Sequence, residues 1–401
     1  MSEGKASTGR RWVKRIAWGI LVVVCAILGG SALSNMFFSA RSDVVDEVTD
    51  LDKARVAEAF HLRSVIGDSL WKGWADAKIP VIIYNEEYAF LIGISNPDSG
   101  WRTVPQDLPR GGPWEIVPSD SIDGKEYYRL QLSDGRAAPQ AFTVRVGTVW
   151  AASMTTKEWT RIKMGNEIRD GLPSLIRPFV PYRLIARIFL GLAMNTDAYI
   201  GALGHESFHA FQGMVAANRL ASAEHVLGRL GGSYPWDDPS FNNAWKTELS
   251  MLGDALSEKE EKRSVELVRK FMTLRRVRRL SFHLDSTMVN LERLREWEEG
   301  LGKYTELALW KRAAADSSYS PVKELSNDSD FDGYKGFARR WAQELSTLRL
   351  QSHGDESRFY YAGMAQGFLL DRLLPDWRTR ILSENVFLED LVDEAIALHG
   401  I

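Results

Sequence analysis

Residues 201–214 read GALGHESFHAFQGM and fall within a predicted helix over 197–220. His205 and His209 are four residues apart, so on a helix they project from the same face, one turn apart. Their imidazoles can then share one metal ion at about 2.0–2.1 Å. Glu206 points to the side of this pair, where it is poorly placed as a ligand but can hold a water molecule. The stretch therefore predicts a metal site suited to hydrolysis.

The residues around the two histidines also fit a packed helix. Phe208, Phe211 and Val215 form a separate apolar stripe for the core. Small residues that would let other elements approach closely are Gly201, Gly204, Ala210, Gly213 and Ala216. The alternative is a pair of core or surface histidines that binds no metal.

A catalytic zinc usually has a third protein ligand and one open position. Glu299, in REWEEGLGKYTELALW (295–310), is the best candidate, because Gly300 and Gly302 leave room for it against the histidine helix. Glu248, in WKTELSMLGDAL, is the alternative third ligand.

Together these residues resemble the gluzincin metallopeptidases. His205-Glu206-x-x-His209 is similar to their zinc motif, and EGLG resembles the EG(F/L)A segment of aminopeptidase-N-like enzymes. The resemblance implies Zn²⁺ held by His205, His209 and Glu299, with Glu206 as general base. Position 303 is Lys, where a carboxylate could have oriented a histidine. Another residue must take that orienting role.

Gluzincins commonly stabilise the oxyanion with a Tyr or His from a later helix. Tyr360 and Tyr361, in ESRFYYAGMAQGFLLDRLLPDW (356–377), are the candidates, with His353 and Tyr304 as others. Packing is the alternative role for such tyrosines. The resemblance also implies an exposed strand edge that pairs with an extended peptide, and AFTVRVGTVWA (141–151) could supply it.

Composition excludes several other classes of protein. The 401 residues are 45% hydrophobic and 26% charged, which is typical of a globular chain with a sizeable core. The net charge of −3 gives no general attraction to nucleic acid, and none is expected as a partner. Cys25 is the only cysteine, so any metal site must use His, Asp or Glu.

The N-terminal region carries a candidate membrane anchor. Residues 16–38 read IAWGILVVVCAILGGSALSNMFF and contain no charge, which is long enough to span a bilayer core of about 30 Å. Five Lys or Arg residues lie in the preceding tail, 1–15, which should stay in the cytoplasm. The rest of the chain would then be extracytoplasmic, at the cell membrane as a single-pass protein. A cleaved signal peptide, giving a secreted protein, is the alternative.

The rest of the chain predicts an α+β protein. A helical stalk is expected at 43–78, with a helix packed against the body as the alternative. An antiparallel β-rich part is expected at 79–154 and a mainly helical, zincin-like catalytic domain at 155–401. Helices are expected near 156–170, 182–194, 197–220, 241–256, 258–283, 285–311, 333–350, 358–374 and 384–398. The charged run at 258–282 reads as a solvated, salt-bridged face, although Arg275 or Arg279 could instead bind a substrate carboxylate.

The sequence therefore favours a membrane-anchored zinc metallopeptidase acting on a peptide or protein. A catalytically inactive, zincin-like binding or assembly module is the alternative. The substrate and the oligomeric state are left open.

Overall fold

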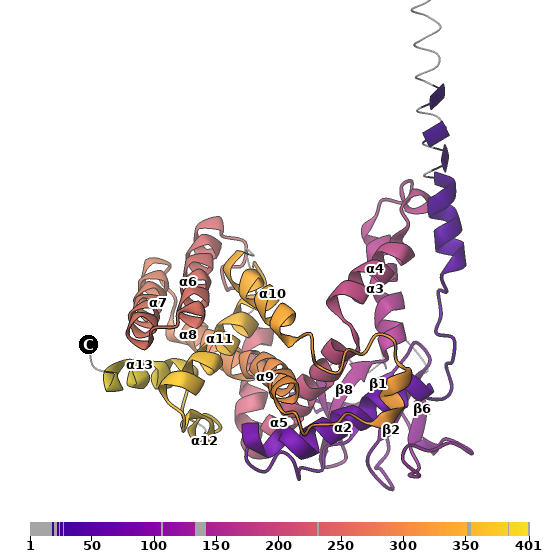
Figure 1. The fold of residues 1–401 in the computed structure, drawn as a ribbon, viewed down its shortest axis with the longest axis horizontal. Helices are drawn as coiled ribbons and strands as arrows, with labels where there is room; N and C mark the ends of the chain where they lie inside the picture. The colour runs from indigo at the N-terminus through magenta and orange to yellow at the C-terminus, as the bar shows by residue number, and fades with distance from the viewer. Residues whose placement is uncertain are drawn as a thin grey trace, which may run out of the picture.

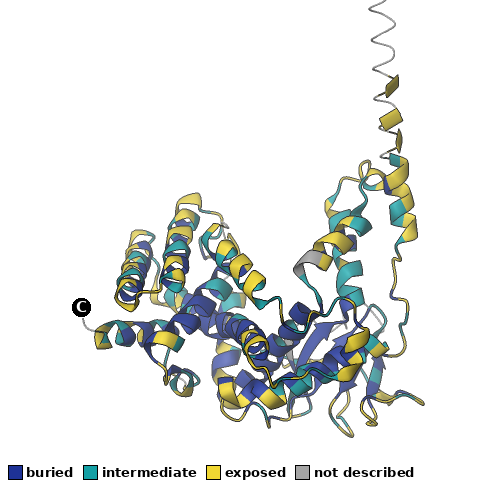
Figure 2. Cartoon of the chain, viewed as in Figure 1, coloured by how far each residue is buried: buried dark blue, intermediate teal, exposed yellow. Residues whose placement is uncertain are grey.

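The structure is a computed structural model. It describes residues 18–19, 22–23, 25–26, 28–105, 107–132, 142–230, 232–350, 354–383 and 385–399. One β-sheet lies in the N-terminal part, and a mostly helical part follows it (Figure 1). The predicted α+β class is confirmed at this level. Buried residues run continuously from the sheet into the helices that cross the middle of the molecule (Figure 2).

The sheet has eight strands in the order β4-β3-β7-β8-β1-β2-β6-β5. The strands are β1 (Val81–Tyr84), β2 (Tyr88–Ile92), β3 (Trp101–Thr103), β4 (Pro109–Arg110), β5 (Glu115–Ile116), β6 (Tyr128–Gln131), β7 (Phe142–Val146) and β8 (Val149–Thr155). Six of the strand pairings between these elements are antiparallel, as expected, but β1 pairs with β8 in parallel, Val81 opposite Ala152. All of β1 and the last five residues of β8 are buried, as parallel strands usually are.

The predicted helices are present, most with small shifts at their ends, but α5 continues ten residues past the expected end at 220, and the short α12 was not predicted. The helices are α2 (Asp50–Leu70), α3 (Lys157–Gly171), α4 (Tyr182–Ala193), α5 (Thr196–Leu230), α6 (Pro239–Ser257), α7 (Glu261–Ser281), α8 (Ser286–Arg295), α9 (Leu301–Ala315), α10 (Phe337–Leu350), α11 (Ser357–Leu373), α12 (Trp377–Arg380) and α13 (Leu388–Leu398). A π-helical turn, Glu296–Gly300, joins α8 to α9, so the helix expected over 285–311 is interrupted. Helix α5 is kinked at Ala216, and Val215 beside the kink is exposed rather than part of the apolar stripe.

Helix α2 packs into the body instead of standing apart as a stalk. It lies against α5 and α9. Just after it, Trp71 stacks on Phe208 of α5 and donates a hydrogen bond to Thr305 of α9 at 2.9 Å. Residues 50–71 therefore belong to the same core as the histidine helix.

The charged run on α7 has the expected solvated, salt-bridged face, with exposed pairs such as Arg263–Glu266, but two of its arginines point into the protein. Arg275 and Arg278 are fully buried, and Arg278 contacts carboxylate oxygens of Glu248 at 2.5 Å and Glu292 at 2.6 Å. Arg275 binds Glu296 through two hydrogen bonds. Each cation compensates a buried carboxylate, so the run builds the interior between α6, α7 and α8.

The predicted membrane anchor at 16–38 includes residues outside the described part of the chain. Residues 28–37 are helical and lead away from the body at its edge (Figure 1). Among the described residues, no helix has the length and apolar character needed to cross a bilayer.

Candidate metal centre

Helix α5 presents the two histidines between the sheet and α9. It packs on β8 on one side and on α9 on the other. Glycines permit both contacts: a Cβ on Gly213 would lie 2.5 Å from the Trp150 ring, and one on Gly204 would lie 2.6 Å from Leu309. The expectation that small residues allow close approach is confirmed at these two positions.

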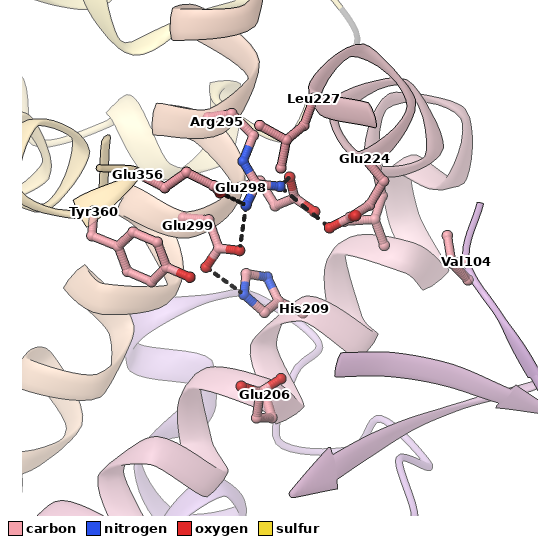
Figure 3. Close-up of a pocket in the computed structure, with 11 residues that line it drawn as sticks. Val104, Glu206, His209, Glu224, Leu227, Arg295, Glu298, Glu299, Glu356 and Tyr360 are labelled. Atoms are coloured by element: carbon pink, nitrogen blue, oxygen red, sulfur yellow. Dashed lines mark hydrogen bonds and ion pairs between the residues drawn. The ribbon is translucent and has the colours of Figure 1, made fainter. Parts of the chain in front are cut away.

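Donor atoms of His205, His209 and Glu299 lie close together beside α5. Figure 3 shows two of these side chains, His209 and Glu299, pointing toward each other. Nε2 of His205 and Nε2 of His209 are 2.9 Å apart, and Oε2 of Glu299 lies 3.3 Å from the first and 3.4 Å from the second. Ligands at about 2.0–2.1 Å from a tetrahedral zinc are themselves about 3.3 Å apart. The donor set and its spacing therefore fit a zinc ion with one position left open.

Glu299 reaches the histidines from the π-helical turn. Gly302, one turn later, faces His205 so closely that a Cβ there would lie 2.6 Å from its Nε2 atom. Such π-helical turns frequently occur at functional sites. Glu248, the alternative third ligand, is instead buried with Arg275 and Arg278 and is not among the residues that meet the two histidines.

Gln212 supplies the orienting contact that the sequence did not assign. Nδ1 of His209 donates to Oε1 of Gln212 at 2.8 Å, and the Gln212 amide donates to the Trp297 carbonyl at 2.9 Å. This arrangement leaves Nε2 of His209 free to bind a metal. On the other ligand, Nδ1 of His205 lies 4.0 Å from Glu306. Lys303, the departure from the gluzincin pattern, binds that same Glu306 at 2.9 Å.

Arg295 organises the carboxylates beside the donor set. Its guanidinium donates to Glu299 Oε1 at 2.9 Å, which leaves Oε2 directed at the histidines. It also donates to Glu298 at 2.6 Å, Glu224 at 3.2 Å and Glu356 at 3.0 Å. Glu224, Glu298 and Glu299 form a second group that could in principle hold a cation, but the Arg295 guanidinium already lies against all three.

Only one of the two predicted tyrosines lies at the centre. The Tyr360 ring stacks on His205 at 5.9 Å between centroids, and its hydroxyl points toward Glu299 (Figure 3). Tyr361 points to the other side of α11 and donates to Glu344 at 2.9 Å. Tyr304 is also elsewhere, donating to Asp371 at 3.0 Å. His353 lies outside the described residues.

Glu206 and Tyr360 line the same cavity, which has a volume of about 270 Å³ and also includes His209 and Glu299. Burial raises the pKa of Glu206, an effect that the neighbouring histidines partly offset. Burial and the charge of Glu299 raise the pKa of Tyr360 well above its usual range. The phenol therefore keeps its proton at neutral pH and can donate it in a hydrogen bond.

His209 and Glu299 each change the pKa of the other. Burial disfavours charge on His209, but its hydrogen bond to Glu299 and the negative charges of Glu299, Glu206 and Glu298 together outweigh burial and raise the pKa of His209 to about 10. The same contacts with both histidines, against the effect of burial, hold the pKa of Glu299 well below its usual range. The centre thus pairs a buried anion with a cation, which is the charge balance that a bound metal would also provide.

Two other expectations about substrate contacts are wrong. Strands β7 and β8, which contain the predicted substrate-binding edge, each pair on both sides, and β4 and β5 form the ends of the sheet. Arg275 and Arg279 are both engaged in ion pairs inside the protein, Arg279 with Glu292 and Glu389. Neither is placed to bind a substrate carboxylate.

Five residues around the centre were not predicted from the sequence: Gln212, Glu224, Arg295, Glu298 and Glu356. Local spacing could have found two of them, because Gln212 follows His209 by three residues and Arg295 precedes Glu299 by four. Glu224 and Glu356 depend on how α5 and α11 pack around the π-helical turn.

Comparisons of the chain with protein-family models, curated proteins and solved structures gave no significant match.

Proposed function

We propose that this protein is a membrane-anchored, zinc-dependent hydrolase that cleaves peptide bonds outside the cytoplasm. One observation carries the proposal: His205, His209 and Glu299 meet at the spacing of a tetrahedral zinc site beside a cavity that contains Glu206 and Tyr360. The free fourth position and the adjacent carboxylate are the features that distinguish catalytic zinc sites from structural ones.

The proposed chemistry uses this chain's own groups around the metal. Zinc bound by these three side chains would supply the Lewis acidity that makes water nucleophilic near neutral pH. Glu206 accepts a proton from the attacking water and then returns one to the leaving amine. Its raised pKa suits both steps, because it brings the carboxyl closer to the working pH.

Tyr360 is the proposed oxyanion donor. Its hydroxyl remains protonated and lies on the side of the cavity lined by Glu299. A hydrogen bond to the negative oxygen of the tetrahedral transition state would stabilise that state more than the substrate. Arg295 and Gln212 act differently: they position Glu299 and His209 and do not reach the reacting atoms.

The first test is the zinc content of the purified full-length chain in detergent, with Glu299→Gln beside it. We expect about one zinc per wild-type chain and loss of most of it in the variant. Glu298→Gln is the matched control, because Glu298 is a buried neighbour that binds Arg295 and is not among the three donors. Absence of zinc from the wild type, even after reconstitution, would refute the proposal.

The second test is cleavage of a peptide library by the zinc-loaded protein, with Glu206→Gln as control. Cleavage that depends on Glu206 supports the peptidase. Full zinc occupancy without any cleavage would favour the zincin-like binding or assembly module instead.

A further inference from the structure

The hairpin formed by α3, α4 and their connecting loop exposes an unusual number of large apolar side chains. Their exposed fractions range from 41% to 85%. They are Leu175, Ile176, Phe179, Ile185, Ile188 and Phe189. Figure 2 shows the hairpin projecting from the body with mostly exposed and intermediate residues, in contrast to the buried elements below it.

Helix α4 is apolar on two faces. Ala186 and Leu190 are buried, and Ala186 contacts Gly165 of α3. Ile185, Ile188 and Phe189 follow the i, i+3, i+4 spacing of a second face, which is exposed. A soluble surface would normally place polar residues there, so this face is suited to contact something apolar.

The same hairpin is attached to the end of the predicted membrane anchor. The Asn35 amide donates to the Val180 carbonyl at 2.8 Å, and Arg183 donates to the Phe38 carbonyl at 2.7 Å. Ser31, one helical turn before Asn35, is also buried. In a helix, residues 31 to 38 rise by about 10 Å. The hairpin therefore lies beside the last two turns of the apolar run at 16–38 (Figure 1).

We infer that the exposed apolar side chains of residues 175–189 insert into the lipid bilayer next to the anchor. The inference rests on the membrane anchoring proposed above. If residues 16–38 span the bilayer, their last two turns lie at its surface, and the attached hairpin lies at the same depth.

The charges of the hairpin fit this location. Residues 169–189 contain four arginines and one aspartate, and that aspartate, Asp170, is paired with Arg169. Arginines that flank an apolar face can bury their stems in lipid and direct their guanidinium groups to phosphate headgroups. Contact with the bilayer at two places would hold the cavity at a fixed height and orientation above the membrane.

The test places a fluorescent label at single cysteines of the full-length chain in phosphatidylcholine–phosphatidylglycerol vesicles with brominated acyl chains, which quench only labels in contact with lipid. Native Cys25 reports on the anchor. Leu175→Cys and Phe189→Cys, each combined with Cys25→Ser, report on the hairpin. Val277→Cys in the same background is the matched control, because Val277 is 53% exposed, close to the 58% of Phe189, but lies on α7.

We expect the labels at 175 and 189 to be quenched, though less than the label at Cys25 in the middle of the anchor, and the label at 277 to keep its fluorescence. Quenching at Cys25 without quenching at 175 and 189 would overturn the inference while leaving the anchor intact. This pattern would indicate that water, a second copy or another protein covers the hairpin. Absence of quenching at all three positions would refute the anchor, and the inference with it. Zinc content and peptide cleavage, measured separately, would still decide the hydrolase proposal.

Discussion

Nδ1 of His209 donates a hydrogen bond to Oε1 of Gln212, 2.8 Å away on the next turn of α5. Because the Gln212 amide is itself tied to the Trp297 carbonyl, the imidazole is held in one orientation. We predict that Gln212→Ala lowers zinc affinity by about 10- to 100-fold, since loss of such an orienting partner typically has this effect. Competition with a chromophoric chelator measures it.

Gln212→Glu tests whether the acceptor atom is what matters. The carboxylate that this change introduces at position 212 cannot donate to the Trp297 carbonyl, but it can still accept the hydrogen bond from Nδ1 of His209. If that acceptor is what matters, we expect most of the wild-type zinc affinity to be kept. Equal loss in both variants would show that the amide contact with the Trp297 carbonyl, and not the acceptor atom, holds the imidazole.

Gly302 provides a steric test of the same centre. A Cβ at this position would lie 2.6 Å from Nε2 of His205, so Gly302→Ala should displace the imidazole and lower zinc affinity by at least about tenfold. Alanine favours helix more than glycine does, so loss of helix propensity cannot explain the effect. Gly228→Ala on α5, where the added methyl meets nothing within 4 Å, should bind zinc normally. Unchanged affinity in Gly302→Ala would contradict this packing.

Two adjacent tyrosines separate a role in the reaction from a role in packing. Tyr360→Phe should reduce kcat by about 10²- to 10³-fold, the usual cost of one oxyanion donor, with zinc content and KM little changed. Tyr361→Phe removes the contact with Glu344, on the other side of α11, and should leave kcat near that of the wild type. Similar rates for the two variants would argue against Tyr360 as the donor.

Zinc should stabilise the folded chain through the three donors. At a free zinc concentration of 100 times the dissociation constant, we expect a gain of about 2.7 kcal/mol, seen as a rise in Tm that a chelator reverses. Glu299→Gln should show little of this rise. A full response in that variant would place the stabilising zinc elsewhere.

The buried ion pairs of α7 predict a large loss of stability on mutation. Arg278→Met would remove the shorter of two ion pairs from each of two buried carboxylates, leaving Glu248 with Arg275 at 3.5 Å and Glu292 with Arg279 at 2.8 Å, and should lower the free energy of unfolding by about 3–5 kcal/mol. Arg263→Met on the same helix breaks an exposed pair with Glu266 and should change stability little. Denaturant unfolding of both variants distinguishes a structural network from a solvated face.

Features that depend on residues close together in the sequence were predicted correctly. The helices follow from apolar spacing, and the meeting of His205 with His209 follows from the geometry of one helix. The choice of Glu299 over Glu248 rested on the glycines beside it, and the close approach of Gly302 to His205 is consistent with that argument.

The failures concern contacts between distant segments. The parallel pairing of β1 with β8 joins residues about 70 positions apart, and β-rich composition alone does not specify strand order. Charge spacing on α7 likewise could not reveal that α6 and α8 carry the matching carboxylates. The choice between Tyr360 and Tyr361 depended on which side of α11 faces the π-helical turn.

The contacts of β8 and α2 with α5 also determine whether the helical part of the chain can fold without the β-rich part. Trp150 of β8 packs into the space left by Gly213, and Trp71 covers Phe208 on the same helix. A fragment starting at residue 155 would keep α9 but expose to water the surfaces of α5 that pack against β8 and α2, and it would lose their support for the histidine helix. The change from β-rich to helical sequence near residue 155 is therefore not a boundary between independently folding domains. We expect the two parts to unfold together in one transition.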